Sequence, residues 1–163
     1  MIEVRRAGKE HIRHLVELCL MVQAEHRERE PRIYSTPSPE SVGTVFESWI
    51  QDGHTEFWLG FLDGAPVGYV ALKVHHRPET PFTFPRKYLE IDQLGTAPEA
   101  QGRGVGRALL RHAEQRAVER GIFDIRIGVR AGNQAAVAFY EHMGYRAAHL
   151  QMVRSISETD EES

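Results

Sequence analysis

Residues 88–110, YLEIDQLGTAPEAQGRGVGRALL, decide the fold class of this chain. In residues 88–95, aliphatic side chains alternate with Glu90 and Asp92, and this period of two predicts a β-strand. After a short break, apolar residues recur at helical spacing from Val105 onward. The stretch is therefore predicted to run from a strand through a loop into a helix, with several glycines where the helix begins.

The glycine-rich loop is suited to holding an anion. It and the first helical turn comprise Gln101, Gly102, Arg103, Gly104, Val105, Gly106 and Arg107. Glycine allows the backbone to turn sharply and to approach a ligand closely. The first N–H groups of a helix have no partner within the helix and lie at the positive end of its dipole. Arg103 and Arg107 add positive charge beside them, so we expect a phosphate-binding site here.

Two common phosphate-binding motifs do not match this loop. A P-loop ends in Gly-Lys-Ser/Thr, whereas this chain has Gly106-Arg107-Ala108. A dinucleotide fingerprint needs a third glycine at the position that Arg107 occupies. The loop instead resembles the acyl-CoA signature of the GNAT superfamily of N-acetyltransferases, Gln/Arg-x-x-Gly-x-Gly/Ala, which is matched by Gln101, Gly104 and Gly106.

A second run, residues 133–145, resembles another GNAT signature through its pattern Asn-x-x-Ala-x-x-Phe-Tyr-x-x-x-Gly-Tyr. Asn133 suits a helix N-cap, and Gly144 suits the end of that helix. The order of expected elements also resembles the GNAT fold over nearly the whole chain. The resemblance implies an α/β (α+β) protein whose mixed central sheet of about six to seven strands is flanked by about four helices.

The other elements are expected from periodicity and turn residues. They are a strand at 2–5, a helix from about 9, a helix capped by Ser38, a hairpin around Asp63-Gly64 that Pro66 lengthens, and strands at 123–129 and 145–153. The proline-rich loop at 75–85 carries Phe82 and Phe84, which we expect either to wall a substrate pocket or to enter the core. Residues 1–154 are expected to form a single domain, and residues 155–163 an acidic, disordered tail.

Composition excludes several function classes. The chain has 163 residues and a formal net charge of -3, so it has no basic excess that would indicate nucleic-acid binding. The first residues lack an apolar signal region, and no apolar run approaches membrane-spanning length. The single cysteine, Cys19, lies on the apolar face of the first helix, where we interpret it as a small buried group. We therefore expect a cytoplasmic protein without membrane contact.

The GNAT resemblance also implies where acetyl-CoA binds as a co-substrate, without any metal. In that family the central strand and the next parallel strand splay apart, and the pantetheine arm enters between them. Carried over by position, Leu94 and Thr96 would offer backbone groups to the pantetheine and the thioester. The amides of residues 101–106 would hold the pyrophosphate, with Asn133 close to the cofactor.

Amine acetylation needs two proton transfers, because an alkylamine is mostly protonated at neutral pH and the departing thiolate gains from an acid. Tyr140 matches the family's general-acid tyrosine, with packing beside Phe139 as the alternative. Glu90 and Asp92 project from one face of the central strand and are both candidates for the base. Glu90 is favoured because family members that use a central-strand glutamate place it there.

Two functions remain open from the sequence. One is acetyl transfer to a small-molecule or peptide amine, and the other is a GNAT-like domain that binds acyl-CoA as a sensor or scaffold. The acceptor is not named by the sequence, because acidic and basic residues are interleaved in the segment after the first helix. A homodimer is an expectation that rests on the family resemblance alone.

Overall fold

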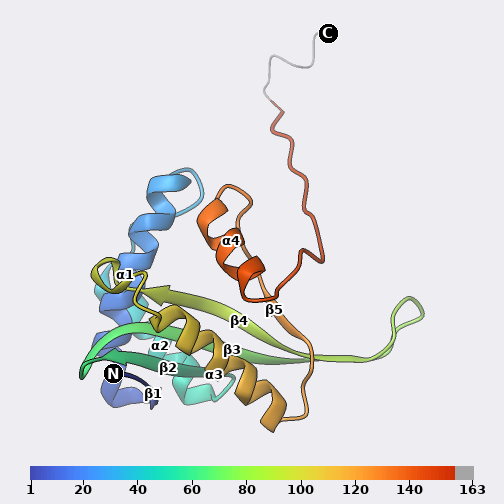
Figure 1. The fold of residues 1–163 in the computed structure, drawn as a ribbon. Coiled ribbons are helices and arrows are strands. Elements are labelled where there is room, and N and C mark those ends of the chain that lie inside the picture. Colours follow the sequence, from blue (N-terminus) through green and yellow to red (C-terminus); the bar gives the residue numbers. More distant parts are fainter. Residues whose placement is uncertain (157–163) are drawn as a thin grey trace.

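The computed structural model describes residues 1–156, which fold around one mixed β-sheet (Figure 1). In chain order the elements are β1 (Ile2–Ala7), η1 (Lys9–His11), α1 (Ile12–Arg29), α2 (Pro39–Asp52), β2 (Thr55–Leu62), β3 (Ala65–Arg77), β4 (Arg86–Thr96), η2 (Pro98–Ala100), α3 (Val105–Glu119), β5 (Ile125–Ile127) and α4 (Gln134–His142). The strands lie in sequence order, antiparallel except for the parallel pair β4–β5. Across residues 1–156, no helix is both long enough and apolar enough to span a membrane.

Helices cover both faces of the sheet, and each face has its own apolar core. On one face, Leu15 of α1 and Phe46 of α2 pack against Phe57 and Tyr69 of the sheet. On the other face, α3 and α4 pack against strands β3 and β4, with Leu109 fully buried. The central strands are therefore covered on both sides, which holds β4 in a fixed position.

Two glycines allow α3 to approach the sheet closely. Gly60 of β2 and Gly68 of β3 are directly opposite each other across the strand pair. A Cβ atom on either glycine would lie 2.9 Å from Cγ1 of Val105, the first residue of α3. The start of α3 is thus held against the middle of the sheet by two positions that accept no side chain.

The predicted hairpin between β2 and β3 forms, but Pro66 does not lengthen its turn. Asp63 and Gly64 have φ angles of 50° and 85°, as a two-residue type I′ turn requires. Pro66 pairs directly with Phe61, and the register shifts by one residue immediately afterwards. A β-bulge therefore accommodates the proline, since it interrupts the ladder only locally.

The loop after β3 differs from both sequence-based alternatives. Strands β3 and β4 continue as far as Arg77 and Arg86, so the hairpin projects beyond the body as a long arm (Figure 1). Phe82 and Phe84 lie in the loop at its tip and are 93% and 85% exposed. They neither wall a pocket nor enter the core, because the continued pairing of the two strands carries them away from the body.

The last predicted strand, at 145–153, does not form, so the sheet of the described residues has five strands rather than six or seven. Residues 146–156 run as an extended segment without secondary structure and are exposed throughout. Strand β5 spans only three of the seven residues predicted for it, so it offers little ladder for a further strand to pair with. Most of the predicted acidic tail, residues 157–163, lies outside the described part of the chain.

Candidate active site

The parallel strands β4 and β5 pair over only three residues, because β5 ends at Ile127. Their register joins Leu89 to Ile125 and ends at Ile91 opposite Ile127. Strand β4 continues to Thr96, and within residues 1–156 no strand pairs with this edge of β4 beyond Ile91. The stretch of β4 from Asp92 to Thr96 thus has an unpaired edge on the β5 side, which we call the opening between the two strands; the family resemblance implies that the pantetheine arm lies here, beside Leu94 and Thr96.

A β-bulge in β4 lies at the start of this opening. Ile91 pairs with Leu72 of β3 and Gln93 pairs with Ala71, so Asp92 is an extra residue without a partner in the ladder. Before the bulge, Ile91 is buried against α3. After it, the Gln93 side chain accepts a hydrogen bond of 2.7 Å from the Tyr69 hydroxyl on the α1–α2 face. The bulge thus changes which side chains of β4 face each helical layer.

The two candidate bases have different partners on β3. The Glu90 carboxylate contacts Nε2 of His75, and both side chains are about one-third exposed or less. The Asp92 Oδ1 atom lies 3.3 Å from Nζ of Lys73, with both side chains about one-quarter exposed. Asp92 is thus paired with the Lys73 ammonium, whereas Glu90 is paired with the His75 imidazole.

The glycine-rich loop leads into α3 as predicted. Gly102 and Gly104 have φ angles of 75° and 89°, and Gly104 is the N-cap residue. The N–H groups of Val105 and Gly106 donate to no acceptor among the described residues. Val105 is buried and Gly106 is partly buried, and their unpaired N–H groups lie at the positive end of the helix, where an anion such as a pyrophosphate is favoured.

Gly106 indicates how a ligand would reach this loop from the opening between the strands. A Cβ atom at Gly106 would lie 3.6 Å from Thr96 Oγ1 of β4 and 3.8 Å from Phe139 Cζ of α4. The missing side chain therefore leaves free a space bordered by both elements. The absence of a side chain at Gly106 would let a ligand approach the backbone of α3 between these two elements.

Four further cofactor candidates already have interactions of their own or are open to solvent. The side-chain amide of Gln101 donates a hydrogen bond of 3.2 Å to the Glu25 carboxylate of α1. The Arg103 guanidinium lies 4.0 Å from the Asp63 carboxylate. Arg107 is exposed at the first turn of α3. The Asn133 side chain accepts from the Ala136 N–H at 3.2 Å and caps α4, as the sequence predicts.

Tyr140, the candidate acid, lies on α4 and is 9% exposed. Its ring makes edge-to-face contacts with Phe139 and Tyr145, with centroids 5.1 and 5.8 Å apart. Burial raises the pKa of Tyr140 far above its usual value, so the phenol keeps its proton at neutral pH. It belongs to the core cluster on the α3 face, whereas Glu90 and Asp92 pair with β3 side chains on the opposite face. The candidate acid and the candidate bases therefore approach the opening from opposite sides of the sheet.

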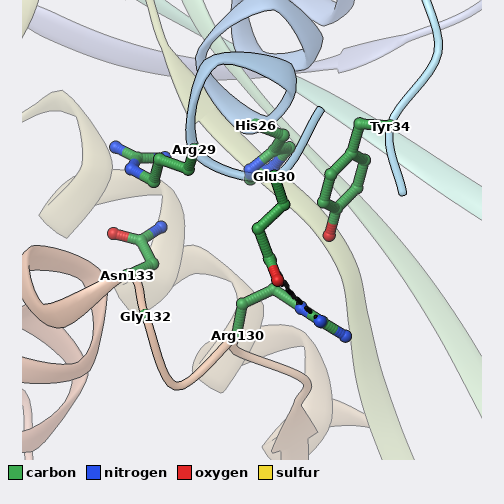
Figure 2. A pocket seen from close by; sticks show the side chains of 7 residues that line it. All are labelled: His26, Arg29, Glu30, Tyr34, Arg130, Gly132 and Asn133. Carbon is green, nitrogen blue, oxygen red and sulfur yellow. Dashed lines mark hydrogen bonds and ion pairs between the residues drawn. The ribbon is translucent and has the colours of Figure 1, made fainter. Parts of the chain in front are cut away.

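A small cavity of about 110 Å³ lies between the end of α1 and the loop that follows β5. Figure 2 shows its lining, which is formed by His26, Arg29, Glu30, Tyr34, Arg130, Gly132 and Asn133. Glu30 and Arg130 form two hydrogen bonds of 2.7 Å across it. Since α1 packs on β4 at Gly95 and Arg130 closely follows β5, this ion pair links the two sides of the opening.

Sequence reasoning missed several of these groups. Lys73, His75 and Tyr69 all come from β3, and only the register of β3 on β4 shows which of them face the two carboxylates. Alternation along β3 was the available signal, because these residues share one side of that strand. Burial raises the pKa of Cys19, which is consistent with a protonated, packed thiol rather than a nucleophile. Within the described residues, no three His, Cys, Asp or Glu side chains gather as a metal site would require.

Comparison with known proteins identifies the family. The model of the acetyltransferase (GNAT) family matches residues 8–145. The chain is 30% identical over 105 residues to an uncharacterized N-acetyltransferase of Methanocaldococcus jannaschii, covering 61% of this chain and 45% of that protein. It is 41% identical over 58 residues to the Escherichia coli [ribosomal protein bS18]-alanine N-acetyltransferase, covering 36% and 39% of the two chains. The chain thus spans less than half the length of these curated relatives.

Solved structures share the fold. A tetramutant of the BH1408 protein from Bacillus halodurans superposes with a TM-score of 0.88 at 20% identity, covering 94% of this chain and 99% of the other. An aminoglycoside N-acetyltransferase, AAC(6')-Iy in complex with CoA, superposes with a TM-score of 0.72 at 13% identity and covers 96% and 95%. Because the family model covers most of the chain, this protein belongs to the acetyltransferase (GNAT) family.

Proposed function

We propose that this chain is an N-acetyltransferase that moves an acetyl group from acetyl-CoA to a primary amine by direct attack in a ternary complex. The observation that carries the proposal is the opening between β4 and β5 after Ile91, which ends at the free N–H groups of α3. Acetyl-CoA supplies an activated thioester when it is bound. The Gln101–Gly106 amides would hold its pyrophosphate, and the free edge of β4 at Leu94 and Thr96 would pair with the pantetheine.

The backbone of β4 would also assist the chemistry. An N–H group on the free edge near Leu94 would donate to the thioester oxygen and stabilise negative charge there. Because helices cover both faces of β4, this N–H group is already fixed in position, and little free energy is spent on orienting it during the reaction. No nucleophilic side chain is required, which agrees with the partly buried thiol of Cys19, whose pKa burial raises.

Glu90 would accept the proton of the incoming ammonium, through a water. Strand rise places Leu94 about 13 Å along β4 from Glu90 and about 7 Å from Asp92, so Glu90 needs an intermediary. The imidazole of His75 would accept the proton in turn or hold the carboxylate in place. Asp92, paired with Lys73, would orient the ammonium instead. Tyr140 would donate a proton to the departing thiolate from the other side of the opening.

The acceptor would enter by the cavity between α1 and the β5–α4 loop. Its walls offer a phenol, an imidazole, arginines and a carboxylate. Relatives act on different acceptors by their names, a ribosomal-protein alanine and aminoglycosides among them, so the acceptor class is proposed only as a small-molecule or peptide amine.

Thiol release from acetyl-CoA, measured over a panel of polyamines, aminoglycosides, amino acids and peptide N-termini, tests the proposal. An enzyme releases thiol in proportion to the acetylated amine found by mass spectrometry. Tight binding of acetyl-CoA with no amine-dependent release across the panel would favour the alternative, a non-catalytic acyl-CoA sensor or scaffold.

A further inference from the structure

The side chain of Lys73 lies between an aromatic ring and a carboxylate at the start of the opening. Its Nζ atom is 4.1 Å from the centre of the Trp49 indole ring of α2 and 3.3 Å from Oδ1 of Asp92 on β4. The Lys73 and Asp92 side chains are about one-quarter exposed, and Trp49 is partly buried. Three elements thus meet around one ammonium group, which solvent can still reach.

Trp49 and Asp92, which together we call the ammonium pocket, recognise a cation in two different ways. The carboxylate supplies an opposite charge, and the face of the indole ring attracts a cation through its quadrupole. Both attractions increase when the cation is partly removed from water. An arylamine is neutral at neutral pH and gains little from either group. The pocket is therefore selective for an ammonium group on an aliphatic carbon.

The two walls of the pocket are fixed, whereas its occupant is not. The Trp49 ring packs against Phe46 and Phe57, with centroids 5.7 and 6.3 Å apart. Asp92 belongs to the bulge of a strand that helices cover on both faces. Lys73 instead reaches the pocket through a flexible four-carbon stem that begins on β3. Its ammonium group can leave without any change in the walls.

We propose that Trp49 and Asp92 bind the aliphatic ammonium group of the acceptor, and that Lys73 fills their pocket until the acceptor arrives. This inference rests on the proposed acetyl transfer and narrows its acceptor to an aliphatic amine that is cationic at neutral pH. Lys73 keeps the Asp92 carboxylate paired in the free protein, because a partly buried charge without a partner is costly. The acceptor must displace Lys73, which lowers its apparent affinity.

Binding of n-butylammonium tests the pocket without any turnover. In 15N-labelled protein, the indole N–H signal of Trp49 should shift when n-butylammonium chloride is added at constant ionic strength. The neutral analogue n-butanol should not shift it. The signal of Trp58, which packs on the α3 face, is an internal control that should not respond. Lys73→Met should tighten n-butylammonium binding about tenfold, as expected if Lys73 fills the pocket for about nine-tenths of the time.

Kinetic constants for the amine test the same pocket during turnover. Lys73→Met should lower the KM for the amine about tenfold, because it removes the competing ammonium. Trp49→Leu should raise this KM about fivefold, and Trp49→Phe should restore most of the loss because it keeps an aromatic face. The KM for acetyl-CoA should not change in any of these variants.

The matched control is the double variant Arg5→Met/Phe61→Leu. It removes a second cation–π pair, in which the Arg5 guanidinium lies 4.6 Å from the centre of the Phe61 ring on the β1–β2 strand pair. Because this pair lies away from the opening, the KM for the amine should stay at the wild-type value.

Three results would overturn the inference. The first is a Trp49 signal that n-butylammonium does not shift in the natural chain or in Lys73→Met, a test that leaves Trp49 itself intact. The second is a KM for the amine that rises in Lys73→Met, because Lys73 would then support the acceptor site rather than fill it. The third is acetyl transfer whose KM for the amine is unchanged in Lys73→Met and Trp49→Leu.

The two proposals can fail separately. A Trp49 signal that shifts with n-butylammonium, together with no amine-dependent thiol release, would support the ammonium pocket and contradict acetyl transfer. Thiol release together with the third result would support acetyl transfer and contradict the pocket.

Discussion

The Nζ atom of Lys73 lies 3.3 Å from Oδ1 of Asp92, the residue that bulges from β4 where the strand separates from β5. The Asp92 carboxylate is thus already held in an ion pair with an ammonium group. Glu90, two residues earlier, contacts His75 instead. The two carboxylates, of which the sequence favours Glu90 as the base, therefore have different partners on β3.

We expect Glu90→Gln to depress turnover near neutral pH by about 10²-fold, with partial recovery at high pH. Turnover should recover at high pH because most of the amine substrate is then already deprotonated and no longer needs a base. Turnover measured from pH 6 to pH 10 tests this, with Glu79→Gln on the hairpin arm as an exposed control. Glu79→Gln should keep the wild-type profile.

Asp92→Asn should instead raise the KM for the amine and change turnover little, because it removes a charge that orients the ammonium. Full two-substrate kinetics separate the two effects. If Asp92→Asn instead lowers turnover near neutral pH with recovery at high pH, and Glu90→Gln changes only the KM for the amine, then Asp92 is the base and Glu90 orients the ammonium.

Tyr140→Phe should lower turnover by about 10²-fold and leave acetyl-CoA affinity nearly intact, since it removes one hydroxyl and preserves the ring contacts. Tyr145→Phe is the matched control. Its ring packs on Tyr140, and its buried hydroxyl has no partner among the described residues. Wild-type turnover in Tyr140→Phe, under conditions where chemistry limits the rate, would leave Tyr140 as a packing residue.

Gly104→Asp should abolish acetyl-CoA binding, because it places a negative charge where the pyrophosphate is expected. Backbone strain is controlled by Gly121→Asp, since Gly121 also has a positive φ, 65°, and lies just beyond the other end of α3. Calorimetry on both folded variants checks the result. Unchanged affinity in Gly104→Asp would remove the loop from the binding site.

Glu56 is expected to be a stability determinant rather than part of the site. It is 5% exposed, lies 2.9 Å from both Arg6 and Arg116, and contacts Arg120. Burial alone would raise its pKa, but the hydrogen bonds from Arg116 and Trp58 outweigh burial and hold the pKa below its usual value. A group with a depressed folded-state pKa stabilises the fold above its unfolded pKa of about 4.3, and this contribution is lost as the pH falls.

Glu56→Gln should therefore cost about 2–4 kcal/mol of unfolding free energy at pH 7, and the difference from wild type should shrink below about pH 4. Urea unfolding at both pH values measures it. The control Glu119→Gln removes a half-exposed carboxylate that pairs with Arg116 and should cost under about 1 kcal/mol. A difference that stays constant with pH would mean that the charge of Glu56 is not what stabilises the fold.

Local chemistry was enough to predict much of the fold. Ser38 caps α2 by accepting from the Ser41 N–H, Asp63-Gly64 makes the tight turn, and Gly104 begins α3, because each depends on a few neighbouring residues. The arm with Phe82 and the unpaired segment after Tyr145 were not predictable in this way. Their state depends on how far strands continue to pair, which periodicity does not determine.

For the site, sequence placed Glu90 and Asp92 on one side of a strand but not beside particular partners. The bulge at Asp92 arises from a register between β3 and β4 that no local pattern encodes. The Glu30–Arg130 pair joins residues 100 positions apart, and only the packing of α1 on β4 brings them together. The sequence therefore did not predict which side chains on neighbouring strands and helices contact each other at the site.

Initial rates over a matrix of acetyl-CoA and amine concentrations test the central claim most directly, using the amine that the panel selects. Direct attack in a ternary complex predicts intersecting double-reciprocal lines and one acetylated amine per thiol released. Parallel lines, with an acetylated form of the protein detectable by mass spectrometry when acetyl-CoA is added alone, would show a covalent enzyme intermediate and contradict the account.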